Sequence, residues 1–373
     1  MSRFDVCIRG EGPVGRALAL ALARQGLRVA LVGPGSPSGA AAPAGPDVRA
    51  YALNAASVAL LQGLKVWDAL PADARTAVQE MRIRGDVPGA QLHFSAWEQA
   101  VAELAWIVDA AELDAALAAA VRFAPHVERL DGEPEAPLRV LAEGRDSAGR
   151  AALGVQAATH SYGHSGVAAR LEGEWPHAGV AHQWFRSPDV LALLPFDRPV
   201  AGRSWGLVWS VPAARAAELL ALDDVAFEQA LTEATEGAAG ALRLRSARAA
   251  WPLRLSQAAS VCGPGWALVG DAAHVVHPLA GQGLNLGLAD VAALAGVLGA
   301  RESWRGLGDE KLLRRYARAR RGATQAMAGV TDGLWHLFAA PDPALRLLRN
   351  QGLSLLDRLG PLKKALAARA LGA

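Results

Sequence analysis

The feature that most constrains the fold is a glycine-rich turn between two apolar runs at the start of the chain. Residues 4–8 form the first run and 27–32 form the second. Between them, 16–25 is rich in alanine and leucine and predicts a helix, which Gly26 can end. The order strand, turn, helix, strand predicts a βαβ unit. The turn carries three glycines in the spacing Gly-x-Gly-x-x-Gly: Gly10, Gly12 and Gly15.

Glycines with this spacing, between a strand and a helix, are typical of a dinucleotide-binding site. They allow a tight turn, close approach of the backbone to a pyrophosphate, and packing of the helix on the strand. The start of the helix offers free N–H groups to the phosphates. Arg9 and Glu11 are unusual in such a turn, and the carboxylate expected about 20 residues later for the ribose is absent, because Val32 leads into Gly33. From this motif alone, a dinucleotide site and a glycine turn without a ligand both remain open.

The composition excludes several classes of protein. The chain has 373 residues, of which 52% are hydrophobic and 20% charged, as in a globular protein with a large core or two domains. A net charge of +2 argues against nucleic acid as a partner. Two cysteines cannot form a disulfide framework, which favours a reducing compartment. The N-terminus lacks the apolar core of a secretory signal, and no apolar run is long enough to span a membrane. We therefore expect a cytoplasmic protein.

The middle of the chain has a different character from its start. Residues 158–252 are rich in Trp, Pro and β-like runs, which predicts a mainly antiparallel sheet with one helix near 225–236. Earlier, 81–83 and 91–94 flank a turn and predict a hairpin. Helical patterns dominate from Leu284 onwards.

A second glycine-rich segment follows another buried run, 266–270. Asp271 then stands where ligands bind in open α/β sheets, and its carboxylate can accept hydrogen bonds from a sugar-alcohol chain. Residues 277–290 read His-Pro-Leu-Ala-Gly-Gln-Gly-Leu-Asn-Leu-Gly-Leu-Ala-Asp. The helix that begins at Leu284 points its N-terminus over the turn and would stabilise negative charge, such as that of a reduced flavin.

These motifs resemble those of the class A aromatic flavoprotein monooxygenases. In that class Gly-Asp-Ala-x-His contacts the ribityl chain of FAD, and the following Pro…Gly-x-Gly turn contacts the flavin ring. More narrowly, 277–290 is similar at every fixed position to the signature of the FAD-dependent hydroxylases of ubiquinone biosynthesis, and the resemblance covers most of the chain. Together the motifs and the resemblance imply these cofactor-binding residues: Gly10, Gly12, Gly15, Arg49, Gly270, Asp271, Pro278, Gly281, Gln282, Gly283, Leu284 and Asn285.

The resemblance implies an α/β fold with three parts. A Rossmann-like FAD-binding domain of the glutathione-reductase type is interrupted by a mainly antiparallel β substrate domain and followed by C-terminal helices. We expect the boundaries to be 1–80, 100–157 and 253–330 for the FAD-binding domain, 81–99 and 158–252 for the substrate domain, and 331–373 for the C-terminal helical region.

The implied function is hydroxylation of the aromatic ring of a polyprenylated phenol in ubiquinone biosynthesis. NAD(P)H would dock transiently and reduce FAD, and O₂ would supply the oxygen. Such an enzyme needs no dedicated nucleophile, so no catalytic side chain is assigned, and no histidine spacing matches a metal site. We expect His274 and His277 to be structural. The implied partners are the prenylated phenol, other quinone-biosynthesis proteins and a membrane surface.

The chain departs from the family at the adenosine half of the site. Glu143 replaces the aspartate of the family's Ala-Asp-Gly motif, and the segment 125–134 before it is too short for the family's small β-hairpin layer. Together with Gly33, this leaves two interpretations: adenosine is held by backbone alone, or flavin binding is weak or lost. The second would make the chain a non-catalytic scaffold of a quinone-biosynthesis complex. A flavoenzyme of another reaction is a third alternative.

Two further features allow two interpretations each. Trp184, Trp205 and Trp209 either line an apolar substrate pocket or pack in the core. In residues 334–373, basic side chains outnumber acidic ones and several leucines fit one helical face. That face either contacts an anionic membrane or covers the protein's own core.

Overall fold

The computed structural model describes residues 3–33, 47–87, 89–276 and 282–339. Its first layer is a six-stranded sheet in the order β16-β17-β9-β1-β2-β8, in which all strands but β16 run parallel. The predicted βαβ unit is confirmed as β1, α1 and β2. The strands are β1 (Val6–Arg9), β2 (Val29–Val32), β8 (Val127–Leu130), β9 (Leu138–Leu141), β16 (Cys262–Gly263) and β17 (Trp266–Leu268).

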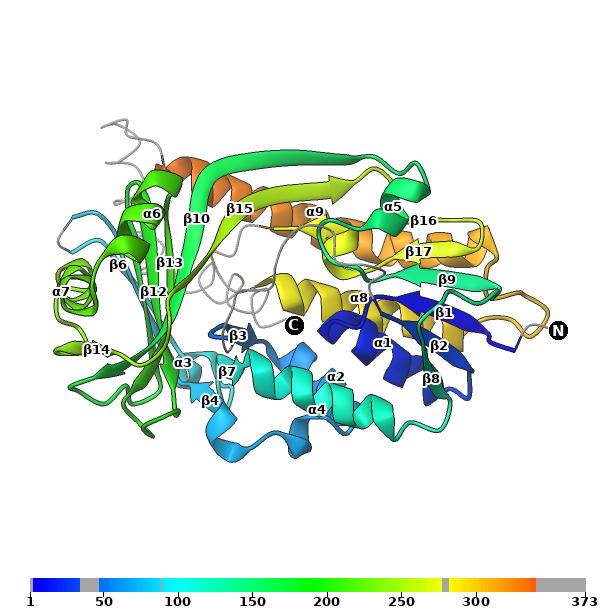
Figure 1. Ribbon diagram of the computed structural model, residues 1–373, viewed down its shortest axis with the longest axis horizontal. Helices are drawn as coiled ribbons and strands as arrows, with labels where there is room; N and C mark the ends of the chain where they lie inside the picture. Colours follow the sequence, from blue (N-terminus) through cyan, green and yellow to red (C-terminus); the bar gives the residue numbers. More distant parts are fainter. Residues whose placement is uncertain (1–2, 34–46, 88, 277–281, 340–373) are drawn as a thin grey trace.

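Helices pack against this sheet through their apolar faces. Helix α1 begins with Pro13 directly after Gly12, a favourable first residue because its missing N–H has no partner in the first turn. It packs against α8 and α4, and α8 packs against α9 (Figure 1). Fully buried Leu18, Leu22 and Val291 belong to the resulting core. The helices of this part are α1 (Pro13–Ala23), α2 (Ala55–Gly63), α4 (Ala110–Arg122), α5 (Ala148–Ala152), α8 (Gln282–Gly299) and α9 (Glu310–Ala339), with the short 3₁₀ turns η1 (Trp67–Ala69), η2 (Ala72–Ala74) and η3 (Gly270–Ala272).

A nine-stranded sheet forms the second layer, in the order β18-β15-β10-β13-β12-β11-β5-β6, with β14 paired to β10. The predicted hairpin is confirmed as β5 and β6. The long strands β10 and β15 run from this sheet towards the six-stranded sheet (Figure 1). The strands are β5 (Glu80–Arg84), β6 (Gln91–Ser95), β10 (Ala157–Gly173), β11 (Val180–Arg186), β12 (Asp189–Phe196), β13 (Ser204–Pro212), β14 (Leu242–Leu244), β15 (Ala249–Ala258) and β18 (His274–Val275).

Because β10 and β15 each continue across a predicted domain boundary, the division of the chain into domains stays a prediction.

A small third sheet, in the order β3-β7-β4, lies beside the large one. The short helix α3 (Ala96–Gln99) follows β6 and precedes β7 in the chain. Its strands are β3 (Ala50–Leu53), β4 (Arg75–Val78) and β7 (Ala105–Asp109).

In the middle of β11, β12 and β13, the two faces of the large sheet differ in side-chain size. Trp184, Trp205 and Trp209 are buried on the face covered by α6 (Ala213–Ala221) and α7 (Asp224–Ala234), in one apolar cluster. Their interpretation as core residues is therefore confirmed, and none of the three lines the large cavity described below. The prediction of one inserted helix was also incomplete, because α6 precedes α7; its alanine-rich sequence directly after a proline gave only a weak signal.

Candidate functional site

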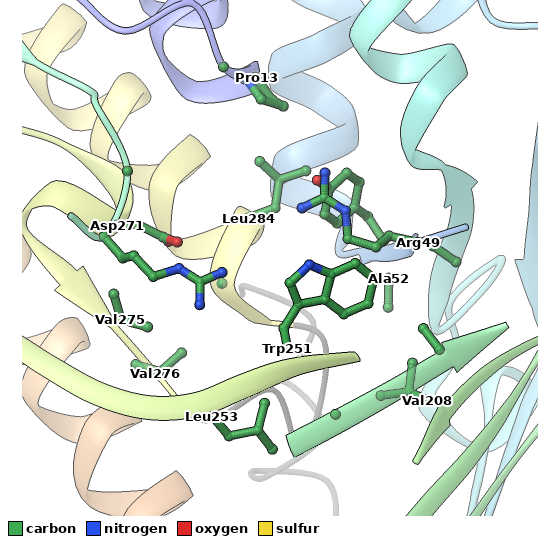
Figure 2. A pocket seen from close by; sticks show the side chains of 18 of the residues that line it. Pro13, Arg49, Ala52, Val208, Trp251, Leu253, Asp271, Val275, Val276 and Leu284 are labelled. Atoms are coloured by element: carbon green, nitrogen blue, oxygen red, sulfur yellow. The ribbon is translucent and has the colours of Figure 1, made fainter. Parts of the chain in front are cut away.

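A cavity of about 880 Å³ lies between the six-stranded and nine-stranded sheets. Its walls come from the β1–α1 turn, β3, the segment after β9, the start of α8, β15 and the small-residue face of the large sheet. Figure 2 shows Pro13 at one end of the cavity and Val208 at the opposite end, with Trp251 between them. One cavity thus connects the glycine turn to the sheet that was predicted to bind substrate.

The glycine turn has the geometry of a phosphate cradle. Gly10 has a φ of +114°, and a Cβ there would lie 2.2 Å from the carbonyl oxygen of Ala142. A Cβ at Gly15 would lie 1.9 Å from the carbonyl oxygen of Gly10. Gly12, in contrast, faces open space and lines the cavity. No side chain caps the start of α1, so its N–H groups are available to a pyrophosphate, and this end of the cavity fits FAD.

Asp271 lies in η3, directly after the parallel strand β17, and lines the cavity opposite Arg49 (Figure 2). Burial raises the pKa of its carboxyl above the ordinary value, although Arg145 and His274 oppose the shift. Arg150 fixes the neighbouring backbone, since its guanidinium donates to the carbonyl oxygens of Ala272 (2.9 Å) and Arg145 (3.1 Å). Within the described residues, no donor holds the Asp271 carboxylate, which leaves it for the hydroxyls of a ribityl chain.

Replacing Asp271 with asparagine or alanine is expected to weaken FAD binding about 10- to 100-fold, because a hydrogen bond to a charged acceptor contributes about 1.5–3 kcal/mol. The protein without flavin should not lose stability. A carboxyl whose pKa is raised by folding lowers stability as the pH rises from its unfolded pKa through its folded pKa, and the full cost remains at higher pH. At neutral pH, Asp271→Asn therefore removes a cost. Flavin titration and thermal unfolding of the flavin-free protein between pH 5 and 8 check both statements. Unchanged FAD affinity in both variants would contradict the assignment.

The start of α8 contributes both cavity wall and support. Gly283 and Leu284 line the cavity, whereas Asn285 is buried behind it. The Asn285 Oδ1 accepts hydrogen bonds from the Asn54 N–H (3.0 Å) and the Ser57 hydroxyl (2.8 Å), and its Nδ2 donates to the Ala52 carbonyl at 2.7 Å. These bonds use the amide to join α8 to β3 and α2, so its predicted direct contact with the cofactor stays a proposal.

The remaining predicted residues divide into three groups. Gly270 has a φ of +60° and packs against Val14 of α1, so it supports the turn from behind the cavity. Gln282 is the first residue of α8. Pro278 and Gly281, like His277, lie outside the described residues.

Arg49 belongs to an aromatic cluster in the middle of the cavity. Its guanidinium carbon lies 5.9 Å from the ring centroids of both Tyr51 and Trp251, and Asp47 pairs with it at 2.7 Å. Buried Arg170 holds the segment by donating to the Arg49 carbonyl at 2.6 Å. The sequence interpretation included Arg49 but missed Tyr51 and Trp251, because strand alternation does not tell which aromatic side chain faces the cavity.

Two departures at the adenosine end compensate for each other. The Arg9 guanidinium at the end of β1 lies 2.7 Å from Oε1 of Glu143, directly after β9. Oε2 of Glu143 accepts hydrogen bonds from the Ser147 hydroxyl (2.6 Å) and the Gly149 N–H (2.8 Å). The longer glutamate therefore reaches both the following turn and the unusual arginine.

Comparisons with known proteins agree with this site. Residues 121–331 match the FAD binding domain family. The chain is 32% identical to Escherichia coli 3-demethoxyubiquinol 3-hydroxylase, over 99% of this chain and 98% of that protein. It is 33% identical to the ubiquinone hydroxylase UbiL of Rhodospirillum rubrum, over 99% and 89%. The crystal structure of p-nitrophenol 4-monooxygenase PnpA from Pseudomonas putida, 18% identical, superposes with a TM-score of 0.75 over 100% of this chain and 99% of that chain.

The fold and site define an FAD-dependent monooxygenase with the aromatic hydroxylase architecture. Within that class, the chain belongs to the ubiquinone-biosynthesis hydroxylase family. The predicted fold class, enzyme class and cofactors, FAD with NAD(P)H as electron donor, are confirmed. In the described part of the chain, nothing favours the non-catalytic scaffold or a flavoenzyme of another reaction.

His274 has the structural role predicted for it. Its Nε2 lies 2.7 Å from the carboxylate of Asp290, and both side chains are buried away from the cavity. Across the described residues, no helix is both long and apolar enough to cross a membrane.

Proposed function

We propose that this protein hydroxylates the aromatic ring of a polyprenylated phenol that is a precursor of ubiquinone. Two relatives that match nearly the whole chain are named for hydroxylation of ubiquinone or demethoxyubiquinol. The observation that carries the proposal is the wall of the cavity opposite the flavin motifs. Most of its side chains are small and apolar, and they come from adjacent strands of the large sheet: Ala181, Gln183, Val190, Ala192, Leu194, Val208 and Ser210.

The wall follows from strand alternation. Ala192 on β12 pairs with Gln183 on β11 and with Val208 on β13, so the three side chains are neighbours on one face. Trp184, Trp205 and Trp209 occupy the opposite face. Small side chains leave room for a substituted ring, and Gln183 offers a polar group that can orient a phenolic hydroxyl.

Bound FAD, reduced by NAD(P)H, supplies the activation of O₂ that the protein's own side chains cannot perform. When FAD is bound, the glycine turn and the start of α1 would hold its phosphates, and Asp271 would hold its ribityl chain. Leu253, Val275 and Val276 give the cavity an aliphatic wall beside Asp271 (Figure 2), which limits water near the reacting atoms.

The experiment that tests the proposal uses the purified protein with NADH or NADPH, O₂ and a short-chain prenylated phenol. A flavin spectrum, substrate-dependent oxidation of NAD(P)H and a product heavier by one oxygen atom are expected. A colourless protein whose melting temperature does not respond to FAD would contradict the proposal.

Ala192→Phe tests the substrate wall separately. A phenylalanine there would project between Gln183 and Val208, so we expect hydroxylation of the prenylated phenol to fall at least tenfold, through KM or kcat, while FAD affinity is unchanged. Ala217→Phe, on the exposed side of α6, is the matched control and should keep full activity. Equal activities of the two variants would show that substrate does not contact this wall.

We also propose that the protein is cytoplasmic and contacts the membrane surface. The reason for the contact is that polyprenylated phenols reside in the bilayer. Support comes from the sequence alone: the basic, leucine-rich residues 334–373, of which 340–373 lie outside the described part. Flotation with anionic vesicles, compared with neutral ones, measures this contact.

A further inference from the structure

The adenosine end of the site lacks the acid that normally binds the ribose of a dinucleotide. In the βαβ fingerprint this carboxylate stands at the end of the second strand. Here β2 ends at Val32 and is followed by Gly33, which has no side chain. Backbone groups alone could hold the ribose, but another carboxylate lies close to the vacated position.

That carboxylate belongs to Glu11, in the glycine turn between β1 and α1. A Cβ built on Gly33 would lie 3.9 Å from Cδ of Glu11 and 4.0 Å from its Oε2. The Glu11 side chain is only 15% exposed and lines the main cavity. Its carboxylate thus occupies the space that a side chain at the end of β2 would enter.

Arg129 fixes the Glu11 carboxylate in place. The guanidinium Nε and Nη2 donate to Oε1 and Oε2 of Glu11, each at 2.7 Å, in a bidentate pair. Arg129 lies on β8, where it pairs in register with Leu31 of β2. The arginine therefore comes from the strand next to the vacated position. It also offsets the negative charge of Glu11, which would otherwise repel a pyrophosphate bound at the same turn.

We propose that Glu11 takes the place of the missing β2 acid and accepts hydrogen bonds from the ribose hydroxyls of the adenosine half of FAD, with Arg129 as its positioning residue. A carboxylate has two oxygens and about four acceptor sites, so the bidentate pair with Arg129 leaves lone pairs for a ribose. The proposal rests on FAD being the cofactor. It explains how the chain keeps the site without the family's acid.

The test compares FAD with FMN, which has the same ring and ribityl chain but no adenosine. Flavin-free protein is titrated with each flavin and followed by quenching of flavin fluorescence. Glu11→Gln is expected to lower FAD affinity about tenfold, the size of one charge-assisted hydrogen bond, and to leave FMN affinity unchanged. Arg129→Met leaves the Glu11 charge unbalanced beside the bound phosphate, so it should weaken both flavins, and FAD by the larger factor.

A relocation variant sharpens the test. Glu11→Ala combined with Gly33→Glu moves the acid back to the end of β2, where, among the described residues, a Cβ comes within 4 Å only of Glu11. This double variant should regain most of the FAD affinity that Glu11→Ala loses. Glu128→Gln, which removes an exposed partner of Arg3 on the same strand β8, is the matched control and should bind both flavins normally.

Three results would overturn the proposal: an unchanged FAD affinity in Glu11→Gln, an equal loss of FAD and FMN affinity, or no recovery in the relocation variant. Thermal unfolding of each flavin-free variant separates these results from misfolding. If the unmodified protein binds FAD no more tightly than FMN, the ribose contact is absent. The protein would still be a flavin enzyme in that case.

Discussion

Replacing Asp290 with alanine is expected to lower the free energy of unfolding by about 3–5 kcal/mol, because it leaves buried charged and polar groups without their partner. Asp290 is fully buried, and its carboxylate joins three elements. It accepts hydrogen bonds from the Gly270 N–H (2.9 Å), His274 Nε2 (2.7 Å) and Arg320 Nε (2.6 Å). From the middle of α8, this one side chain holds the turn that carries Asp271, the strand β18 and the long helix α9.

Flavin binding should be lost together with stability, although Asp290 does not line the cavity. The measurement is chemical denaturation of the flavin-free protein, with FAD titration under native conditions. Glu310→Ala is the control, since it removes an exposed pair with Arg314 on the same helix α9 and should change stability by less than about 0.5 kcal/mol. A native-like denaturation midpoint for Asp290→Ala would show that the network is dispensable.

Gly15→Ala and Gly12→Ala are expected to fail in different ways, although they lie three residues apart in one turn. A methyl group at Gly15 would lie 1.9 Å from the Gly10 carbonyl oxygen, so α1 must move away from β1. We expect a loss of about 1–3 kcal/mol in the flavin-free protein, as for other overpacked sites, and with it the loss of the phosphate cradle.

Gly12→Ala should leave the flavin-free protein as stable as before. Its φ of −73° suits any residue, and no atom of the described part of the chain lies within 4 Å of an added Cβ. The methyl group would instead occupy the space where the backbone approaches the pyrophosphate, so FAD affinity should fall roughly tenfold or more. Denaturation and FAD titration of both variants measure the two effects independently. A stable Gly15→Ala protein, or full FAD affinity in Gly12→Ala, would contradict the geometry described for this turn.

The sequence by itself determined the features that depend on local order. The spacing of Gly10, Gly12 and Gly15 between apolar runs was sufficient for the βαβ unit, because the tight turn requires glycine at Gly10 and close helix packing requires it at Gly15. The segment 277–290 was sufficient for the family, since a long motif of specific residue types seldom occurs by chance. Strand alternation also marked the hairpin of β5 and β6.

Only the tertiary structure decided which side chains meet. Alternation gives each strand two faces, but it does not tell that Trp184 packs under α7 while its neighbour Gln183 lines the cavity. The pairing of Arg9 with Glu143, and the place of Glu11 beside Gly33, join segments from different strands of one sheet. In the sequence, each of these residues by itself is a departure from the pattern expected at the adenosine end of the site. Parallel strands bring their carboxyl ends to one edge, and there the departures lie close enough to compensate for one another.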